Sequence, residues 1–387
     1  MKFDFDKITD RRNTGSIKWN VDENILPMWI ADMDFETAPC IRDAIKTKAE
    51  LGIFGYEESP EEWYDAYINY WGKYHHLTFS KEDMCFSTGV IPIVSSAVRK
   101  LSSPGENVVI QTPVYNIFTN SIVNNGRNVL ENPLIYKNGE YSIDFDDLEL
   151  KLSNPQTTLM ILCNPHNPVG KIWDKETLSE IGRLCSEYDV KVISDEIHCD
   201  IVAPGFEYIP FASASEICRE ISVTAIAPTK CFSIPGIQSA CCVVFNQGLR
   251  NRMFKALNTD EVAEGNTFSY ISAISAFKEG REWLDEMNSY VQGNREFVSS
   301  YLEKHIPSAK LVNGNATYLL WIDLSAFTDN TKDLCDFLKE RTGLWVTAGS
   351  VYGKNGSAFI RMNVATQKTR VQDGLERLKK GIELYIK

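Results

Sequence analysis

The 387-residue sequence lacks any long basic run, internal repeat or low-complexity tract. Its formal net charge is -12, so it has no electrostatic footprint for nucleic acid or for an anionic membrane surface. No window reaches the ~18 consecutive apolar residues of a membrane-spanning helix, and the N-terminal residues lack the apolar core of a signal peptide. We therefore expect a cytoplasmic protein with no nucleic-acid or membrane partner.

The cysteines and histidines form no pattern that predicts a disulfide framework or a metal site. The ten cysteines are too dilute for such a framework, and none is spaced as C-x-x-C. Cys163, Cys241 and Cys242 stand in apolar runs, which is typical of buried reduced thiols. The five histidines do not combine with the cysteines at metal-ligand spacing, so we expect no metal.

The sequence does contain enough apolar residues for a large core. It is 43% hydrophobic, and its length favours two packed units. From about residue 85 to 245, short apolar runs alternate with helix-length segments. The predicted strands are NVVIQTP, TLMILCNP, VKVISDE and SACCVVFN, and the predicted helix is DKETLSEIGRLCSEYD. This alternation predicts an α/β domain with a parallel sheet and a ligand site at the carboxyl ends of its strands.

After about residue 280 the pattern changes. A long helical segment, REWLDEMNSYVQGNREFVSSYLEKH, precedes two strand-like runs, ATYLLWIDL and AFIRMNVA. A second helical segment, RVQDGLERLKKGIELYI, follows them. These elements predict a separate α+β unit.

The first segment with chemical interest is STGVIPIVSSAVRKL, in which Thr88 and Gly89 precede a helical pattern. Free backbone N–H groups at such a helix start bind anions, and glycine permits close approach. Many helices begin with Thr-Gly for capping reasons alone, so this segment carries little weight by itself.

The second segment, CNPHNPVG at residues 163–170, directly follows an apolar strand. Its two prolines stop regular structure, and its asparagines can donate hydrogen bonds from a stiff loop. A single Asn-Pro would favour a plain turn, but the doubled motif followed by Gly170 favours a functional loop. We predict a cis Asn167-Pro168 bond, because the loop has to redirect the Asn167 side chain immediately after the strand.

The third segment, KVISDEIH, ends a buried strand with Asp195 and Glu196. A buried carboxylate requires a charged partner, because unpaired burial is costly or raises its pKa. That partner is either an arginine or helix N-terminus of the fold, or the protonated ring nitrogen of a cofactor.

The fourth segment, AIAPTKCFSIPGIQSA, places Lys230 among small and apolar residues. Poor solvation lowers the pKa of a lysine and favours the neutral amine that forms a Schiff base. Taken alone, Lys230 could equally be a lysine at a strand end whose amine reaches the solvent.

In this order and spacing, the four segments resemble the fold-type I pyridoxal 5'-phosphate (PLP) enzymes, the aspartate aminotransferase superfamily. LPMWIADMDF, FGY at 54–56, CNPHNPVG, SDEIH, APTKCFSIPG and FIRMNVA are most similar to its cystathionine β-lyase branch, the MalY/PatB-type C-S lyases. The resemblance covers nearly the whole chain. It implies a large domain, 46–284, with a mostly parallel sheet sandwiched by helices, and a smaller α+β domain from 1–45 and 285–387.

The resemblance also implies roles for residues around the cofactor ring. Lys230 would form the Schiff base with PLP and later move the α-proton, and Asp195 would keep the ring nitrogen protonated. Asn167 would bind the phenolic oxygen. His198 occupies a place that is usually tyrosine in aminotransferases. Tyr115 matches the aromatic residue that stacks on the ring, although it could be an ordinary core tyrosine.

Further implied roles concern the phosphate and the substrate. The backbone of Gly89 and Val90 and the hydroxyl of Thr229 would bind the phosphate. Tyr56 would reach that phosphate from a second subunit, which implies a homodimer with shared active sites. Arg361 would bind the α-carboxylate of an amino-acid substrate through a bidentate pair.

Two positions depart from the aminotransferase pattern, since Gln238 replaces a usual phosphate-binding arginine and Ala227 replaces a common serine. Both departures agree with the lyase branch. The leading hypothesis is therefore β-elimination from L-cystathionine or L-cysteine-type substrates, giving pyruvate, ammonia and a thiol. The alternatives are an aminotransferase with a keto-acid acceptor and a regulatory protein that keeps PLP as a ligand. Against the last, mere binding would not require a carboxylate-binding arginine.

Overall fold

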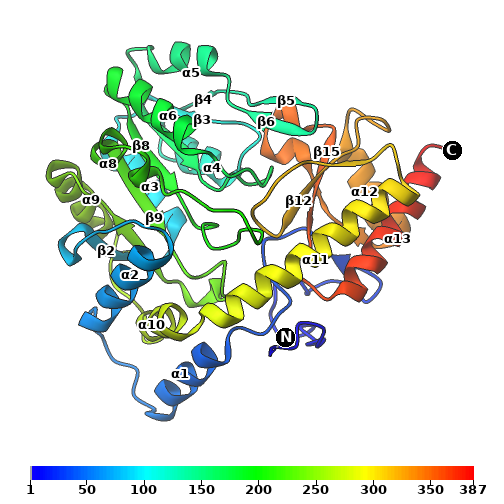
Figure 1. The fold of residues 1–387 in the computed structure, drawn as a ribbon, viewed down its shortest axis with the longest axis horizontal. Helices are drawn as coiled ribbons and strands as arrows, with labels where there is room; N and C mark the ends of the chain where they lie inside the picture. The colour runs from blue at the N-terminus through cyan, green and yellow to red at the C-terminus, as the bar shows by residue number, and fades with distance from the viewer. Residues whose placement is uncertain (1) are drawn as a thin grey trace.

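The computed structural model describes residues 2–387 and contains a central seven-stranded sheet (Figure 1). In spatial order its strands are β2 (Met84–Ser87), β10 (Ala240–Val243), β9 (Ser222–Ile226), β8 (Lys191–Asp195), β7 (Thr157–Cys163), β3 (Asn107–Ile110) and β4 (Asn128–Glu131). The five strands from β9 to β4 are parallel. The predicted mostly parallel sheet is therefore confirmed.

The strand predicted from SACCVVFN departs from the parallel pattern, because β10 runs antiparallel to both of its neighbours, β2 and β9. The chain between β9 and β10 contains only a short 3-10 helix, Pro235–Ile237. A parallel return would require a longer crossover, usually a full helix. The strand was correctly predicted, but its direction depends on this connection.

Helices cover both faces of the sheet. On one face lie α3 (Val90–Leu101), α4 (Ile117–Val123) and α9 (Gln247–Thr259), which share a core with Val108 and Ile110 of β3. On the other lie α5 (Phe145–Leu152), α6 (Lys175–Glu187), α7 (Phe211–Ala214) and α8 (Glu216–Ile221), whose core includes Val109. Side chains that alternate along a strand thus enter two different cores, which explains the continuous apolar runs of the central strands.

A second sheet follows in the C-terminal part of the chain. It contains β11 (Lys310–Leu311), β12 (Leu319–Asp323), β15 (Phe359–Asn363) and β14 (Thr347–Ala348), paired antiparallel in that order. Beside it pack α11 (Arg281–His305), α12 (Thr331–Thr342) and α13 (Lys368–Tyr385). In Figure 1, α11 runs from near α10 (Ser269–Glu279) toward α12 and α13. The elements predicted after residue 280 are all present.

The N-terminal segment joins this second unit. Strand β1 (Leu26–Pro27) pairs in parallel with β13 (Leu344–Trp345). Helices α1 (Pro39–Glu50) and α2 (Glu61–Tyr74) then lie beside α10 at the far end of the molecule (Figure 1). A hairpin of β5 (Ile135–Lys137) and β6 (Glu140–Ser142) lies near the second sheet. None of the helices within residues 2–387 is long and apolar enough to cross a membrane.

Candidate active site

A cavity of about 1030 Å³ lies beside the residues that follow strand β9. Its walls include the segment from Trp29 to Thr37, which enters from the N-terminal part of the chain. Three of the predicted site residues, Tyr115, Lys230 and Arg361, line it together. Residues more than 200 positions apart are thus brought to one place, where the strand ends predicted a ligand site.

Lys230 lies in the segment that follows β9, and its side chain is partly exposed to the cavity. Its Nζ donates a hydrogen bond to the carbonyl oxygen of Ala31 over 2.7 Å. Burial lowers the pKa of Lys230 to about 8, although the nearby carboxylate of Asp32 acts in the opposite direction. About a tenth of this amine is therefore neutral at pH 7, far more than for an ordinary lysine, as nucleophilic or base chemistry requires.

Asp195 is the last residue of β8 and is buried. Its Oδ1 accepts a hydrogen bond from the backbone N–H of Ile197 over 3.1 Å, and no cation among residues 2–387 forms an ion pair with it. Burial raises the pKa of Asp195 to about 6. A buried carboxylate without a cationic partner is costly, and a protonated nitrogen of a ligand would remove that cost.

His198 lies in the turn after β8 and is also buried. Burial lowers the pKa of His198 to about 3, and the positive charges of Lys230 and Arg361 add to this effect. The imidazole is therefore neutral, and its buried Nδ1 has no hydrogen-bond partner within the described part of the chain. A neutral imidazole can donate or accept one further hydrogen bond from a bound group.

Arg361 extends from strand β15 into the cavity and is buried. It donates from Nη1 to Oδ1 of Asn167 over 3.2 Å and from Nη2 to the carbonyl oxygen of Trp29 over 2.9 Å. Its Nε has no partner within residues 2–387. The guanidinium is also 4.8 Å from the centre of the Tyr352 ring. A buried guanidinium held only by neutral groups beside a cavity is suited to binding a carboxylate.

Asn167 lies in the proline-containing loop after β7, and the Asn167-Pro168 bond is cis, as predicted. The Asn164-Pro165 bond of the same loop is cis as well. The loop is buried, and the Nε2 atom of His166 lies 2.9 Å from the carbonyl oxygen of Pro113. Asn167 thus contacts the guanidinium of Arg361 from the loop at the carboxyl end of the interior strand β7.

The predicted anion-binding residues Gly89 and Val90 begin helix α3. No side chain of the described residues caps this helix, so its first N–H groups are available to a ligand. A Cβ atom on Gly89 would lie 3.1 Å from Cδ of Pro92, so a larger residue would crowd this turn. Thr229 is buried next to Lys230, while Gln238 is exposed.

Tyr115 is half-buried and lines the cavity. Burial raises the pKa of its phenol, with a contribution from Asp195. Tyr56, in contrast, is fully exposed in the segment between α1 and α2, and it does not line the cavity of its own chain. The structure thus brings Tyr115, Lys230 and Arg361 to one cavity and Asn167 to Arg361, whereas Tyr56 lies outside this cavity.

Several cavity residues were not singled out from the sequence as chemically important. They include Trp29, Asp32 and Arg11 from the N-terminal part of the chain. The signal was the segment LPMWIADMDF, which carried part of the family resemblance but received no role. Local sequence patterns could not connect the polar residues of this segment with Lys230. Ala31, whose carbonyl oxygen binds Lys230, is 199 positions away from it in the sequence.

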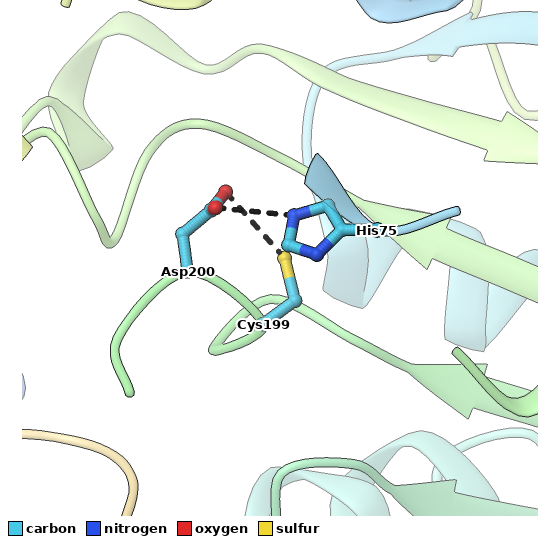
Figure 2. A group of neighbouring side chains, drawn as sticks. All are labelled: His75, Cys199 and Asp200. Carbon is cyan, nitrogen blue, oxygen red and sulfur yellow. Dashed lines mark hydrogen bonds and ion pairs between the residues drawn. The ribbon is translucent and has the colours of Figure 1, made fainter. Parts of the chain in front are cut away.

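A compact buried group consists of His75, Cys199 and Asp200, whose metal-ligating types of atom are all within 4.8 Å of one another (Figure 2). Asp200 Oδ1 accepts a hydrogen bond from the Tyr70 hydroxyl over 2.8 Å and lies 3.1 Å from His75 Nε2. The backbone oxygen of Asp200 accepts from Asn288 over 2.8 Å. Because these partners already engage Asp200, we interpret the group as a hydrogen-bond network that fixes the turn after Asp195.

Glu196 has a similar structural role. Its carboxylate accepts hydrogen bonds from Ser194 Oγ over 2.7 Å, from the backbone N–H of Phe211 over 2.9 Å and from the Tyr208 hydroxyl. Burial raises the pKa of Glu196 to about 7. Of the two neighbouring acids, Glu196 is thus satisfied by the protein, while Asp195 is left for a ligand.

These observations fit the cofactor that the sequence resemblance implies. The carboxylate of Asp195 and Nδ1 of His198 are buried without partners that satisfy them. Both are close enough to Lys230, a cavity lysine with a lowered pKa, for its positive charge to lower their own pKa values. An uncapped helix start supplies an anion site. An aromatic phosphate with a protonatable ring nitrogen and a reactive aldehyde matches each of these features.

Comparison with known proteins gives a consistent result. The family model for aminotransferase class I and II matches residues 23–378. Cystathionine beta-lyase PatB of Bacillus subtilis is 38% identical over 98% of this chain and 99% of its own, and Protein MalY of Escherichia coli is 31% identical over 97% and 98%. The structure of cystalysin from Treponema denticola, which contains pyridoxal 5'-phosphate, has a TM-score of 0.96 and 31% identity, covering 99% of both chains.

Proposed function

The chain belongs to the class I and II aminotransferase family, and we infer that it is a PLP-dependent carbon–sulfur β-lyase of that family. We propose L-cystathionine and L-cysteine-type amino acids as its substrates. The observation that carries this proposal is that Lys230 and Arg361 are hydrogen-bonded to carbonyl oxygens of one short segment, at Ala31 and Trp29. A base and a carboxylate-binding group therefore face the same cavity at short range.

We propose that residues at the ends of five strands of the large sheet, β2, β3, β7, β8 and β9, hold the cofactor. Asp195 would pair with the ring nitrogen, and Asn167 and His198 would bind the phenolic oxygen. Tyr115 would cover the ring face. The backbone of Gly89 and Val90 and the hydroxyl of Thr229 would bind the phosphate, which is supported by the free N–H groups at the start of α3.

When bound, PLP supplies an electron-withdrawing ring that stabilises negative charge at the substrate α-carbon. Arg361 binds the substrate α-carboxylate and thereby orients the bond between Cα and its hydrogen. The Lys230 amine, with its lowered pKa, accepts the Cα proton. The bond between Cβ and sulfur then breaks, and the sulfur leaves with its electron pair and is protonated to a thiol. With one water consumed, the remaining carbon skeleton becomes pyruvate and the amino group becomes ammonia.

The test is a pyruvate assay on L-cystathionine without added keto acid. A β-lyase releases pyruvate, ammonia and homocysteine in equal amounts, because elimination requires no second substrate. Exchange of amino groups with 2-oxoglutarate and no pyruvate from any sulfur amino acid would instead establish an aminotransferase.

We further propose that two chains form a homodimer in which Tyr56 of one subunit contacts the cofactor phosphate of the other. The support is an exposed apolar segment around Tyr56 that a globular protein would not leave in water. It comprises Leu51, Ile53, Phe54 and Tyr56, all well exposed in the single chain. A partner subunit would cover it.

Two further proposals concern organisation and location. We propose that residues 46–284 form the large cofactor-binding domain and that 1–45 and 285–387 form the small one, which is supported by the two separate sheets. We also propose a cytoplasmic location. In its support, the ten cysteines are unpaired and eight are buried, as expected in a reducing compartment.

A further inference from the structure

An ion pair adjoins the reacting groups in the cavity. Arg361 Nη2 is bound to the carbonyl oxygen of Trp29, and Lys230 Nζ to that of Ala31. The next residue is Asp32, whose Oδ2 accepts a hydrogen bond from Arg11 Nη2 over 2.6 Å. Asp32 directly follows Ala31, and the Cα atoms of consecutive residues are about 3.8 Å apart. The far end of an extended substrate whose α-carbon lies at Lys230 can therefore reach the Arg11–Asp32 pair.

The pair is accessible to a ligand. Both side chains line the cavity, and they are 27% and 19% exposed for Arg11 and Asp32. Asp32 uses only Oδ2 for Arg11, and no side chain or backbone group of residues 2–387 donates a hydrogen bond to Oδ1. The cavity therefore contains an unused carboxylate oxygen next to a guanidinium.

The neighbouring acid Asp34 differs from Asp32 in its hydrogen-bond partners. It is buried, its Oδ2 accepts from Lys18 Nζ over 2.9 Å and its Oδ1 from Trp19 Nε1 over 2.7 Å. Asp34 is thus satisfied inside the protein and has a structural role. Both acids line the cavity, but the side chain of Asp32 is 19% exposed against 2% for Asp34, and Asp32 lacks this second set of partners.

A purely structural role for the Arg11–Asp32 pair explains only part of its geometry. Nη1 of Arg11 also donates to the carbonyl oxygen of Met33 over 2.9 Å and to Oδ1 of Asp34 over 3.4 Å, so it fastens the N-terminal residues to this segment. Those two bonds would suffice for fastening and leave Nη2 for Asp32. Partly exposed ion pairs contribute little to stability, so stability does not account for a carboxylate facing the cavity.

We propose that the Arg11–Asp32 pair recognises the far end of the substrate, with Asp32 binding an ammonium group and Arg11 a carboxylate. This inference rests on the proposed β-lyase function and specifies its substrate class. The preferred substrates are thioethers of L-cysteine whose leaving group carries its own amino-acid zwitterion, as in L-cystathionine. Opposite charges at adjacent positions match such a zwitterion through charge-assisted hydrogen bonds.

The experiment compares two substrates in two forms of the holoenzyme. The substrates are L-cystathionine and S-(3-carboxypropyl)-L-cysteine, which lacks only the distal amino group. Wild type should favour L-cystathionine in kcat/KM by about tenfold to a hundredfold, the usual range for one charged hydrogen bond. Asp32→Asn should reduce this ratio to about one, because the amide keeps the shape and an oxygen for Arg11 but loses the charge.

The ratio isolates recognition from catalysis. Asp32 also affects the pKa of Lys230, but that effect applies to both substrates and cancels in the ratio. The matched control is Glu36→Gln, since Glu36 lines the same cavity and pairs with Lys7 over 2.6 Å. Its ratio should stay near that of wild type, and an equal loss in Glu36→Gln would overturn the assignment to Asp32.

The remaining outcomes separate this inference from the proposed function. If wild type cleaves both thioethers with equal kcat/KM, the inference is wrong and the β-lyase function stands. The comparison of substrates on wild type requires no variant, so it remains decisive if Asp32→Asn does not fold. If wild type releases pyruvate from L-cysteine but from neither thioether, the inference is wrong and the β-lyase function stands. If it releases pyruvate from no sulfur amino acid, the β-lyase function itself is refuted, and the inference with it.

Discussion

Arg361 Nη1 donates a hydrogen bond to Asn167 Oδ1 over 3.2 Å, and this contact joins the second sheet to the loop that follows β7. The proposed substrate-binding group and a proposed cofactor-binding group thus hold each other in place. Because Arg361 is buried and its other hydrogen-bond partner is the Trp29 carbonyl, its position depends on both parts of the chain. Substitutions at Arg361 should therefore affect orientation as well as binding.

We predict that Arg361→Ala raises KM and lowers kcat for L-cystathionine. Loss of a buried charge-assisted pair costs about 2 to 5 kcal/mol, which corresponds to a roughly 30-fold to several thousandfold decrease in kcat/KM. Steady-state kinetics with the pyruvate assay measure it. Arg361→Lys is the matched variant, since it keeps the charge but loses the planar fork, and it should recover only part of the loss. Unchanged kinetics in Arg361→Ala would remove this residue from substrate binding.

We predict that the purified protein shows the visible absorption band of an imine between Lys230 and the cofactor and that Lys230→Ala loses this band, because only a covalent link between the lysine amine and the cofactor aldehyde forms that imine. Activity should decrease by about a hundredfold to ten-thousandfold through loss of the base. Lys191→Ala, at the opposite end of strand β8, should keep both properties. An unchanged absorption band in Lys230→Ala would refute the assignment.

The pKa of Lys230 predicts how cofactor capture depends on pH. Only the neutral amine attacks an aldehyde, so PLP uptake by the cofactor-free protein should accelerate about tenfold per pH unit below pH 8 and level off above it. Stopped-flow absorbance measures the rate. Nα-acetyl-lysine, whose free side-chain amine has a pKa of about 10.4, is the reference, and its rate of reaction with PLP should continue to rise beyond pH 9. A protein profile that also rises to pH 10 would contradict the lowered pKa.

The raised pKa of Asp195 predicts that its carboxylate lowers the free energy of unfolding of the cofactor-free protein, although the same carboxylate is proposed to bind the cofactor. Its pKa is raised to about 6, so the folded state binds more protons than the unfolded state between about pH 4 and 6. The free energy of unfolding contributed by this group therefore falls as pH rises through that window, by roughly 3 kcal/mol. Asp195→Asn should be more stable than wild type at pH 7, with the difference shrinking toward pH 4, and should bind PLP more weakly.

Denaturant titrations at pH 4.5 and pH 7 measure this difference. The matched control is Asp189→Asn, because Asp189 lies on an exposed turn just before the same strand. Equal stability of wild type and Asp195→Asn at pH 7 would show that Asp195 has a charged partner in the cofactor-free protein.

The proposed role of Tyr56 predicts complementation between two defective variants. If Tyr56 acts across the dimer, a hybrid of Lys230→Ala and Tyr56→Ala subunits contains one site with both native residues. Mixing and refolding the two inactive variants should therefore restore pyruvate release. If Tyr56 acts within its own subunit, every site of the hybrid carries one substitution and no activity returns.

The sequence by itself determined the secondary structure and the residues with unusual local settings. Strands such as β7 and β8 were predictable because continuous apolar runs follow from burial on both faces, and Lys230 and Asp195 were recognisable as charges within such apolar surroundings. The assignment of roles came from the resemblance to a family rather than from these patterns.

Only the tertiary structure decided which segments meet. In the structure, β10 runs antiparallel to β9, and Glu196 accepts hydrogen bonds from protein groups while Asp195 is left with an incomplete set of partners. Asp32 and Arg11 line the same cavity as Lys230. No local periodicity encodes these outcomes, because they depend on how two separately built sheets pack and on where the N-terminal segment passes between them. Tyr56 lies fully exposed for a related reason, since its proposed contact belongs to a second chain.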